Sequence, residues 1–414
     1  MRRLRALPAC LLGMFAASVA AAQDGPVFEL EIRRHASTPL TEAEADRILR
    51  DAGGVAARVD GPNDVSCPVT LSRLGPVNVF DFGDGAINSR SEFLDVNNGP
   101  GNVKVVRELN WCGAIAPNVI GCAPVPGRSL VVVRIAASLE GILWLHEYAH
   151  NKGRSHRNQI EAVMFPSIGS NRRSLNAEEC AAIQAAPSAA TGPLSGGEDP
   201  ISFDGAAPPV GEYVRGRWVH GLPFELTAET YGPDDVPALL NILESRSRSE
   251  DWANAATALA IIGNARAANY LIRFIERPEP DDLSAPARRA KTAAIIALGY
   301  LVNRTASPLA LGYLLDRAEV ANWRGIETVP PLAPGQPAAA RRADLGEHAV
   351  LGLALSGNAR AHARLNAMLA PSGDPEQEAF QIRARALIQQ CVNVCSLVGA
   401  QGLERYYEGR EEGF

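Results

Sequence analysis

The sequence predicts an α+β domain built on a twisted mixed sheet, followed by an all-α domain of helical repeats. Up to residue 186, short β-rich runs alternate with helical patterns, which is typical of a mixed domain. Residues 187–212 are rich in Pro, Gly, Ser and Ala and lack periodicity, which indicates a linker. Residues 213–414 are almost entirely Ala/Leu/Ile-rich helical pattern. The 414 residues suffice for two or three domains.

Residues 1–22 predict a secretory signal peptide. Three arginines within the first five positions precede an apolar run that ends in three alanines, so we expect cleavage after Ala22. The apolar run is short for a membrane span, and a retained anchor is the alternative. The protein is therefore expected to be secreted or periplasmic, and residues 23–40 could supply at most a short pro-segment.

The first helix expected in the first domain, residues 23–186, begins with a capping box at Thr41. Thr41 can cap the helix while Glu44 reaches back to its amide, and Gly53-Gly54 is expected to end this helix. The later expected elements are short strands at 77–82 and 103–106, a fully buried strand at 129–135, a helix at about 137–152 and a last helix from Asn176, with Glu178 and Glu179 in its first turn.

The second domain, residues 213–414, contains a weak internal repeat. Paired helices that expose an apolar face on each side must stack to bury both, which gives an α-solenoid. The pattern resembles a HEAT-type repeat array, and a plain helical bundle is the alternative. Three segments align on Gly263, Gly299 and Gly357: residues 256–271, 292–304 and 350–365.

Composition limits the partners. The formal net charge of −6 is mild and gives no support for nucleic-acid binding or for a polybasic membrane surface. No apolar run after the signal peptide reaches membrane length, so no stable membrane insertion is expected of the mature chain. Its expected partners are a protein or peptide substrate and a protein partner bound through the helical repeats.

Six cysteines follow the signal peptide, an even number that predicts disulfides in an exported protein. Cys112 and Cys122 bracket a loop containing Pro and Gly and are the preferred pair. Cys67 with Cys180 would then tie together the two ends of the first domain. Cys391 and Cys395 lie at helical spacing, where a bond is often strained, and buried thiols are the favoured interpretation.

The most specific motif is H-E-x-x-H-x-x-G-x-x-H, which starts at His146. His146 and His150 are i and i+4, so on a helix they share one face and can bind one ion. Glu147 would lie beside the open side of that ion, where it can take a proton from water. Gly153 permits a sharp turn that returns His156 as a third nitrogen ligand. Three imidazoles are the ligand set of an open, catalytic zinc site.

The region from His146 to Pro166 resembles the metzincin metallopeptidases, and its spacing is most similar to the matrixin branch. Met164 follows the third histidine where these enzymes carry a methionine turn beneath the metal. Residues 175–184 resemble the acidic start of their final helix. The resemblance implies zinc on the three histidines, Glu147 as general base, Met164 as the floor of the site, and Pro166 near the wall of the pocket beside the scissile bond.

Two departures from the family pattern stand out. Arg157 follows the third histidine, where matrixins usually have a small hydroxyl residue. The chain also lacks the cysteine-containing segment that holds matrixins latent, so latency through a cysteine–zinc bond is not expected. The other four histidines lack ligand spacing and were not expected at the site: His35, His220, His348 and His362.

The expected function is that of an exported zinc-dependent endopeptidase, with an extended substrate along an edge strand near residues 113–125. Two alternatives stay open: a repeat-based binding protein whose zinc domain is silent, and a protein that processes only itself. Calcium could bind the Asp/Asn/Gly-rich stretches at 81–85 and 95–102, although such loops are more often simple turns.

Overall fold

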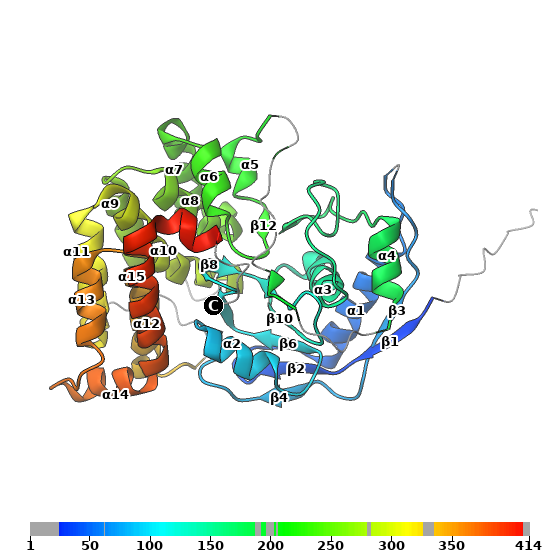
Figure 1. Ribbon diagram of the computed structural model, residues 1–414, viewed down its shortest axis with the longest axis horizontal. Coiled ribbons are helices and arrows are strands. Elements are labelled where there is room, and N and C mark those ends of the chain that lie inside the picture. The colour runs from blue at the N-terminus through cyan, green and yellow to red at the C-terminus, as the bar shows by residue number, and fades with distance from the viewer. Residues whose placement is uncertain are drawn as a thin grey trace, which may run out of the picture.

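The chain forms a mixed α/β region with several sheets, followed by a mostly helical region (Figure 1). The computed structural model describes residues 25–61, 63–186, 192–195, 203, 206–279, 283–325 and 335–408. The predicted signal peptide and most of the predicted linker lie outside the described residues. No helix in the described part of the chain is long and apolar enough to cross a membrane.

The first region contains strands β1 to β11 and helices α1 to α4. Their bounds are β1 Val27–Leu30, β2 Ile32–His35, α1 Glu42–Ala56, β3 Thr70–Arg73, β4 Asn78–Phe80, β5 Ala86–Ile87, α2 Arg90–Asn97, β6 Val103–Val106, β7 Glu108–Trp111, β8 Ile115–Val119, β9 Gly121–Cys122, β10 Leu130–Val133, α3 Ala137–Asn151, β11 Ser167–Ile168 and α4 Ala177–Gln184.

The main sheet has five strands in the order β4-β2-β6-β10-β9. Its strands pair in parallel except β9, which is antiparallel to β10 and forms one edge. Every residue of β6 and β10 is buried. The apolar run of β10 predicts this for a strand covered on both faces, whereas β6 also buries Lys104, whose ammonium donates to the Asn97 carbonyl. Because β2 lies between β4 and β6, residues 32–35 of the expected short pro-segment pair within the main sheet.

Helix α1 begins as predicted but ends later. The Thr41 side chain accepts from the Glu44 amide, and the Glu44 carboxylate accepts from the Thr41 amide. The expectation that Gly53-Gly54 ends the helix was wrong, since α1 continues to Ala56. A Cβ at Gly53 would lie 2.9 Å from the Val69 carbonyl oxygen. This glycine therefore permits close packing against the neighbouring chain instead of terminating the helix.

Two disulfides link the same cysteines that the sequence favoured. Cys67 pairs with Cys180, and Cys112 pairs with Cys122. The first bond joins the chain before β3 to α4, and the second joins the chain after β7 to β9. Cys391 and Cys395 are buried free thiols. The disulfides indicate an oxidising compartment.

The second region is mostly helical and contains one short strand, β12. Its elements are α5 Val210–Tyr213, β12 Arg217–Trp218, α6 Phe224–Thr230, η2 Pro233–Asp235, α7 Val236–Glu244, η3 Arg246–Asp251, α8 Trp252–Ile262, α9 Ala267–Glu276, α10 Ala285–Thr305, α11 Pro308–Arg317, η4 Val320–Trp323, α12 Ala338–Ser356, α13 Ala359–Ala367, α14 Pro375–Arg383 and α15 Arg385–Glu408.

The three glycines on which the repeats align are not equivalent. Gly263 and Gly357 both follow helix ends, those of α8 and α12. Gly299 instead lies inside α10, where a Cβ would come 2.2 Å from the carbonyl oxygen of Gly352. Its role is to let α10 and α12 pack closely, so the alignment on Gly299 was wrong even though the aligned segments are helical.

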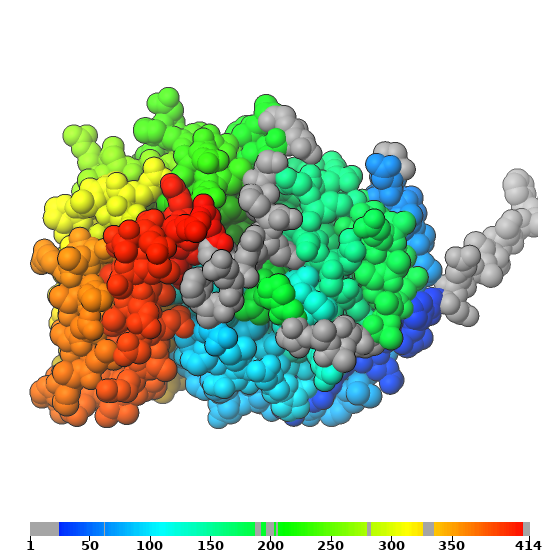
Figure 2. All heavy atoms as spheres, viewed as in Figure 1, coloured from blue at the N-terminus to red at the C-terminus, as the bar shows by residue number. Residues whose placement is uncertain are grey.

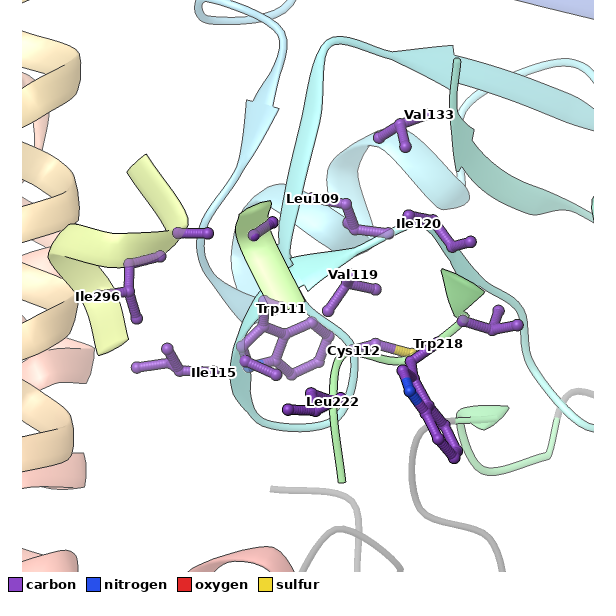
Figure 3. Close-up of a cluster of buried hydrophobic side chains, with 14 of the residues drawn as sticks. Leu109, Trp111, Cys112, Ile115, Val119, Ile120, Val133, Trp218, Leu222 and Ile296 are labelled. Carbon is purple, nitrogen blue, oxygen red and sulfur yellow. The ribbon is translucent and has the colours of Figure 1, made fainter. Parts of the chain in front are cut away.

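The two regions share a continuous hydrophobic core among the described residues. Helix α10 packs against β8, with Ile115 and Ile296 both buried (Figure 3). On the face shown in Figure 2, the orange-red helix α15 borders the light-blue residues of the first region. The Arg90 amide at the start of α2 donates to the Gln390 side chain of α15 over 2.9 Å. The Ile115 amide donates to the Tyr406 hydroxyl and its carbonyl accepts from Tyr407, both over 2.8 Å.

A set of buried charged residues, here called the junction cluster, also joins the two regions. Glu108 on β7 faces His348 on α12 with 3.0 Å between Oε1 and Nε2. Arg107 lies 3.2 Å from Asp84 and 3.4 Å from Asp344. The cluster is completed by Glu347, so its members are Asp84, Arg107, Glu108, Asp344, Glu347 and His348.

Candidate metal centre

Helix α3 supplies the first two candidate ligands. It follows β10 directly and is buried from Glu140 to Asn151. His146 and His150 lie one helical turn apart, and their Nε2 atoms are 3.0 Å from each other. Both side chains are completely buried.

The chain then turns back and brings a third imidazole to the first two. Gly153 has a φ of +81°, the left-handed conformation that the motif predicts at this position. After this turn, the His156 ring lies 5.3 Å from the His146 ring and 4.9 Å from the His150 ring, measured between centroids. The three histidines of the motif are therefore close together.

Two hydrogen bonds fix the tautomer of the helix histidines. His146 Nδ1 lies 2.7 Å from the Val163 carbonyl oxygen, and His150 Nδ1 lies 2.7 Å from that of Arg154. Because a carbonyl oxygen only accepts, each Nδ1 must carry the proton. The Nε2 atom of each neutral ring is then free of a proton and can bind a metal. The carbonyls of Val163 and Arg154 hold the two rings in place.

The turn at 162–166 supports this arrangement from the other side. Val163 supplies the carbonyl that holds His146, and the fully buried Met164 accepts from the Arg157 amide over 2.9 Å. The Arg157 guanidinium in turn lies 3.0 Å from Glu179 at the start of α4. Arg157, which departs from the matrixin pattern, thus ties the third ligand's segment to the last helix of the first region.

His220 is a fourth member of the site, which we call the histidine cluster: His146, His150, His156 and His220. The expectation that His220 takes no part in the site was wrong. Its ring lies 5.0 Å from the His156 ring and 5.7 Å from the His150 ring. In the sequence, His220 is far from the motif and has no other candidate ligand near it. It reaches the site because β12, which precedes it, pairs antiparallel with β11.

The donor set fits a transition-metal ion. The four histidines can each offer a nitrogen, and these atoms all lie within 4.8 Å of one another. Two nitrogens bound to one tetrahedral zinc would be roughly 3.3 Å apart, close to the 3.0 Å between the Nε2 atoms of His146 and His150. Two unprotonated nitrogens facing each other at that distance repel unless a cation lies between them. Imidazole nitrogen suits zinc and its neighbours in the transition series.

Calcium finds no comparable site. Within the described chain, no second group of three or more histidine, cysteine or acidic side chains has metal-binding geometry. Asp84 in the stretch at 81–85 is paired with Arg107, and the Asn97 carbonyl in the stretch at 95–102 accepts from Lys104 over 3.0 Å. Other polar residues of the two stretches, Asp81 and Asp95, are exposed.

Glu147 lies between α3 and the edge strand β9. Its side chain is completely buried, and Oε1 is 3.7 Å from His220 Nε2. A Cβ on Gly121 would come 2.2 Å from that same oxygen. Only glycine at position 121 therefore leaves room for the carboxylate beside the histidine cluster.

Residues 217–221, here called the inserted segment, lie against both the predicted substrate edge and the turn after Met164. Trp218 pairs with Ser167, and the Val219 amide donates to the Pro166 carbonyl over 3.0 Å. The Val219 carbonyl accepts from the amides of Ile120 and Gly121 over 2.8 and 3.2 Å. The predicted edge at 113–125 includes β8 and β9, and its backbone is thus in contact with the chain itself.

Comparisons of this chain with protein-family models, with curated proteins and with solved structures gave no match.

Proposed function

We propose that this protein is an exported zinc-dependent endopeptidase. The observation that carries the proposal is the convergence of His146, His150 and His156 with a buried carboxylate, Glu147, at their side. A metal that serves only structure does not need an adjacent carboxylate, whereas hydrolysis needs a group that moves a proton. The disulfides and the predicted signal peptide support an exported, metzincin-like enzyme.

The residues of the site have separate roles in the proposed reaction. Zinc, when bound, supplies Lewis acidity toward water and toward the carbonyl oxygen of a peptide. Glu147 takes a proton from the attacking water and later gives it to the amine that leaves. Val163 and Arg154 keep the two helix imidazoles oriented through their carbonyls. Gly121 provides the space that the carboxylate occupies.

The proposed function is tested with the purified full chain on casein or gelatin, with and without a chelator. Because His220 also lies in the cluster, the His220→Ala variant is assayed beside the parent. Chelation should abolish cleavage, and Glu147→Ala should abolish it while zinc stays bound. A Glu147→Ala variant that retains full activity would contradict the mechanism, and a lack of cleavage by both parent and His220→Ala would contradict the function.

The fourth histidine favours a second candidate function. Four protein ligands are typical of a closed structural zinc site. In this alternative the metal stabilises the fold, and the helical region, which would be HEAT-like, binds a protein partner. The protein would then show full zinc occupancy and no chelator-sensitive cleavage in any variant.

A further inference from the structure

The inserted segment lies against the strand edge that is predicted to bind an extended substrate. It runs from β12 to Gly221, between the edge strand β9 and the turn after Met164. Val219 connects the edge strand to the turn after Met164. Its carbonyl accepts from the amides of Ile120 and Gly121, and its amide donates to the Pro166 carbonyl. An extended substrate paired with this edge would need the same amide donors.

His220, the residue after Val219, is the fourth histidine of the candidate metal site. His220 is 7% exposed, with its ring nitrogens among those of the other three histidines. With His220 in place, the site has the ligand count of a closed zinc centre, and without it the count is that of an open, catalytic one. A single side chain therefore separates the two states.

The inserted segment is also held from the helical region, in addition to its backbone contacts beside the candidate metal site. Arg217 donates to Asp251 over 3.0 Å. Asn254 of α8 donates to the carbonyls of Val214 and Gly216, just before the segment, over 3.1 and 2.7 Å. Trp218 is buried (Figure 3). Its indole nitrogen donates to the Tyr213 carbonyl over 3.1 Å.

The turn after His220 is also closely fitted. Gly221 has a φ of +83°, and a Cβ there would lie 2.9 Å from the Pro117 carbonyl oxygen. A side chain at this position would push the segment away from β8. Backbone contacts, an ion pair and a glycine thus converge to hold His220 at one place.

We propose that residues 217–221 are an internal inhibitor, with Val219 blocking the substrate edge and His220 occupying the fourth ligand position of the metal. The consequence for catalysis rests on the proposed peptidase function, whereas the blocking of the metal does not. Activation requires withdrawal of the segment, and the helical region that anchors it is then the part of the molecule that sets latency.

The inference is tested on the full chain loaded with cobalt, using acetohydroxamate as a probe that binds an open metal position. If the open form of the parent is populated at about a tenth or less, His220→Ala should bind acetohydroxamate at least about 10-fold more tightly than the parent. The visible absorption of cobalt should change with it, because one nitrogen ligand is lost. Arg217→Ala should shift the affinity in the same direction while all four histidines are retained.

Arg215→Ala is the matched control, because Arg215 is an exposed arginine just before the segment. It should behave as the parent. Equal acetohydroxamate affinity of parent and His220→Ala would overturn the inference, as would loss of cobalt from His220→Ala, since His220 would then be an indispensable ligand. If His220→Ala binds the probe tightly and cleaves no protein substrate, the internal inhibitor stands and the peptidase function fails.

Discussion

The histidine cluster and the junction cluster are both buried groups of titratable side chains, yet they are built in opposite ways. In the junction cluster, acids face bases: Glu108 faces His348, and Arg107 lies between Asp84 and Asp344. In the histidine cluster, four like groups face one another, with Glu147 3.7 Å from His220. The first arrangement pairs opposite charges, whereas the second brings together nitrogen donors that could hold a metal ion.

This difference separates a structural polar core from a candidate site. Burial and unusual chemistry are common to both clusters, so neither property identifies function. What distinguishes the histidine cluster is that one nitrogen of each ring lies within 4.8 Å of the others, while hydrogen bonds to carbonyls fix the rings of His146 and His150. The following predictions test whether the histidine cluster depends on a bound metal and the junction cluster on its own ion pairs.

The largest effect is expected when a ligand is removed from the histidine cluster. His150→Ala should lower zinc affinity by about 1,000-fold and thereby remove stabilisation on the order of 4 kcal/mol at saturating zinc. Zinc content and urea unfolding with and without a chelator measure the effect. His362→Ala on α13 is the control. An unfolding curve of the parent that does not respond to chelation would contradict the prediction.

A smaller loss of stability is expected at the junction cluster, with no change in zinc content. Glu108→Ala leaves His348 and Arg107 without a carboxylate that both face, and such a loss costs about 3 kcal/mol. Glu108→Gln should cost less, because it can still accept from the Thr292 hydroxyl. Urea unfolding and metal analysis check both variants. A loss of zinc from Glu108→Ala would show that the clusters are not independent.

Gly121→Ala should affect turnover without removing the metal. The new Cβ would meet Glu147 Oε1 and displace the carboxylate, so kcat should fall by about 10- to 100-fold. The comparison is made in the His220→Ala background, with zinc content measured in parallel. Gly54→Ala is the control, since a Cβ there meets nothing within 4 Å. Unchanged turnover in Gly121→Ala would remove Glu147 from the proposed mechanism.

The smallest effect is a pH dependence that comes from the junction. Burial and the nearby Glu347 raise the pKa of Glu92 to about 8. Burial alone would lower the pKa of His348, but Glu108 outweighs it and raises this pKa above its usual value. Both groups hold a proton more tightly when folded, so their stabilisation is fully present below the unfolded pKa values, about 4.3 and 6.5, and is lost as pH rises through the folded ones.

The free energy of unfolding should therefore fall on the order of 2 kcal/mol between about pH 6 and 9. Glu92→Gln should flatten the slope, because a carboxamide oxygen can still accept from the Asn88 amide without ionising. The control is Glu404→Gln at an exposed position of α15. Urea unfolding at a series of pH values checks the result, and a parent that gains stability over this range would contradict it.

The local parts of the site were readable from the sequence. The spacing of His146 and His150, the turn at Gly153, the capping box at Thr41 and the helix start near Asn176 depend on residues within one or two helical turns. The two disulfides followed from an even count and from loop positions. The division into a mixed region and a helical region followed from periodicity.

What the sequence did not reveal depends on contacts between distant segments. His220 reaches the cluster only because β12 pairs with β11, a tertiary pairing for which two residues carry no pattern. The packing roles of Gly53 and Gly299 also require the neighbouring backbone, so a helix terminator and a repeat position were inferred instead. The junction cluster combines residues from both regions and has no signature in either.

The two tyrosines near the end of α15 have a consequence for how the protein behaves at high concentration. Their hydroxyls take both backbone hydrogen-bonding groups of Ile115, so β8 offers no free donor or acceptor there to a strand from another molecule. Exposed strands are templates for edge-to-edge aggregation, and proteins commonly cover them. The last helix therefore also acts as a guard against self-association of the sheet.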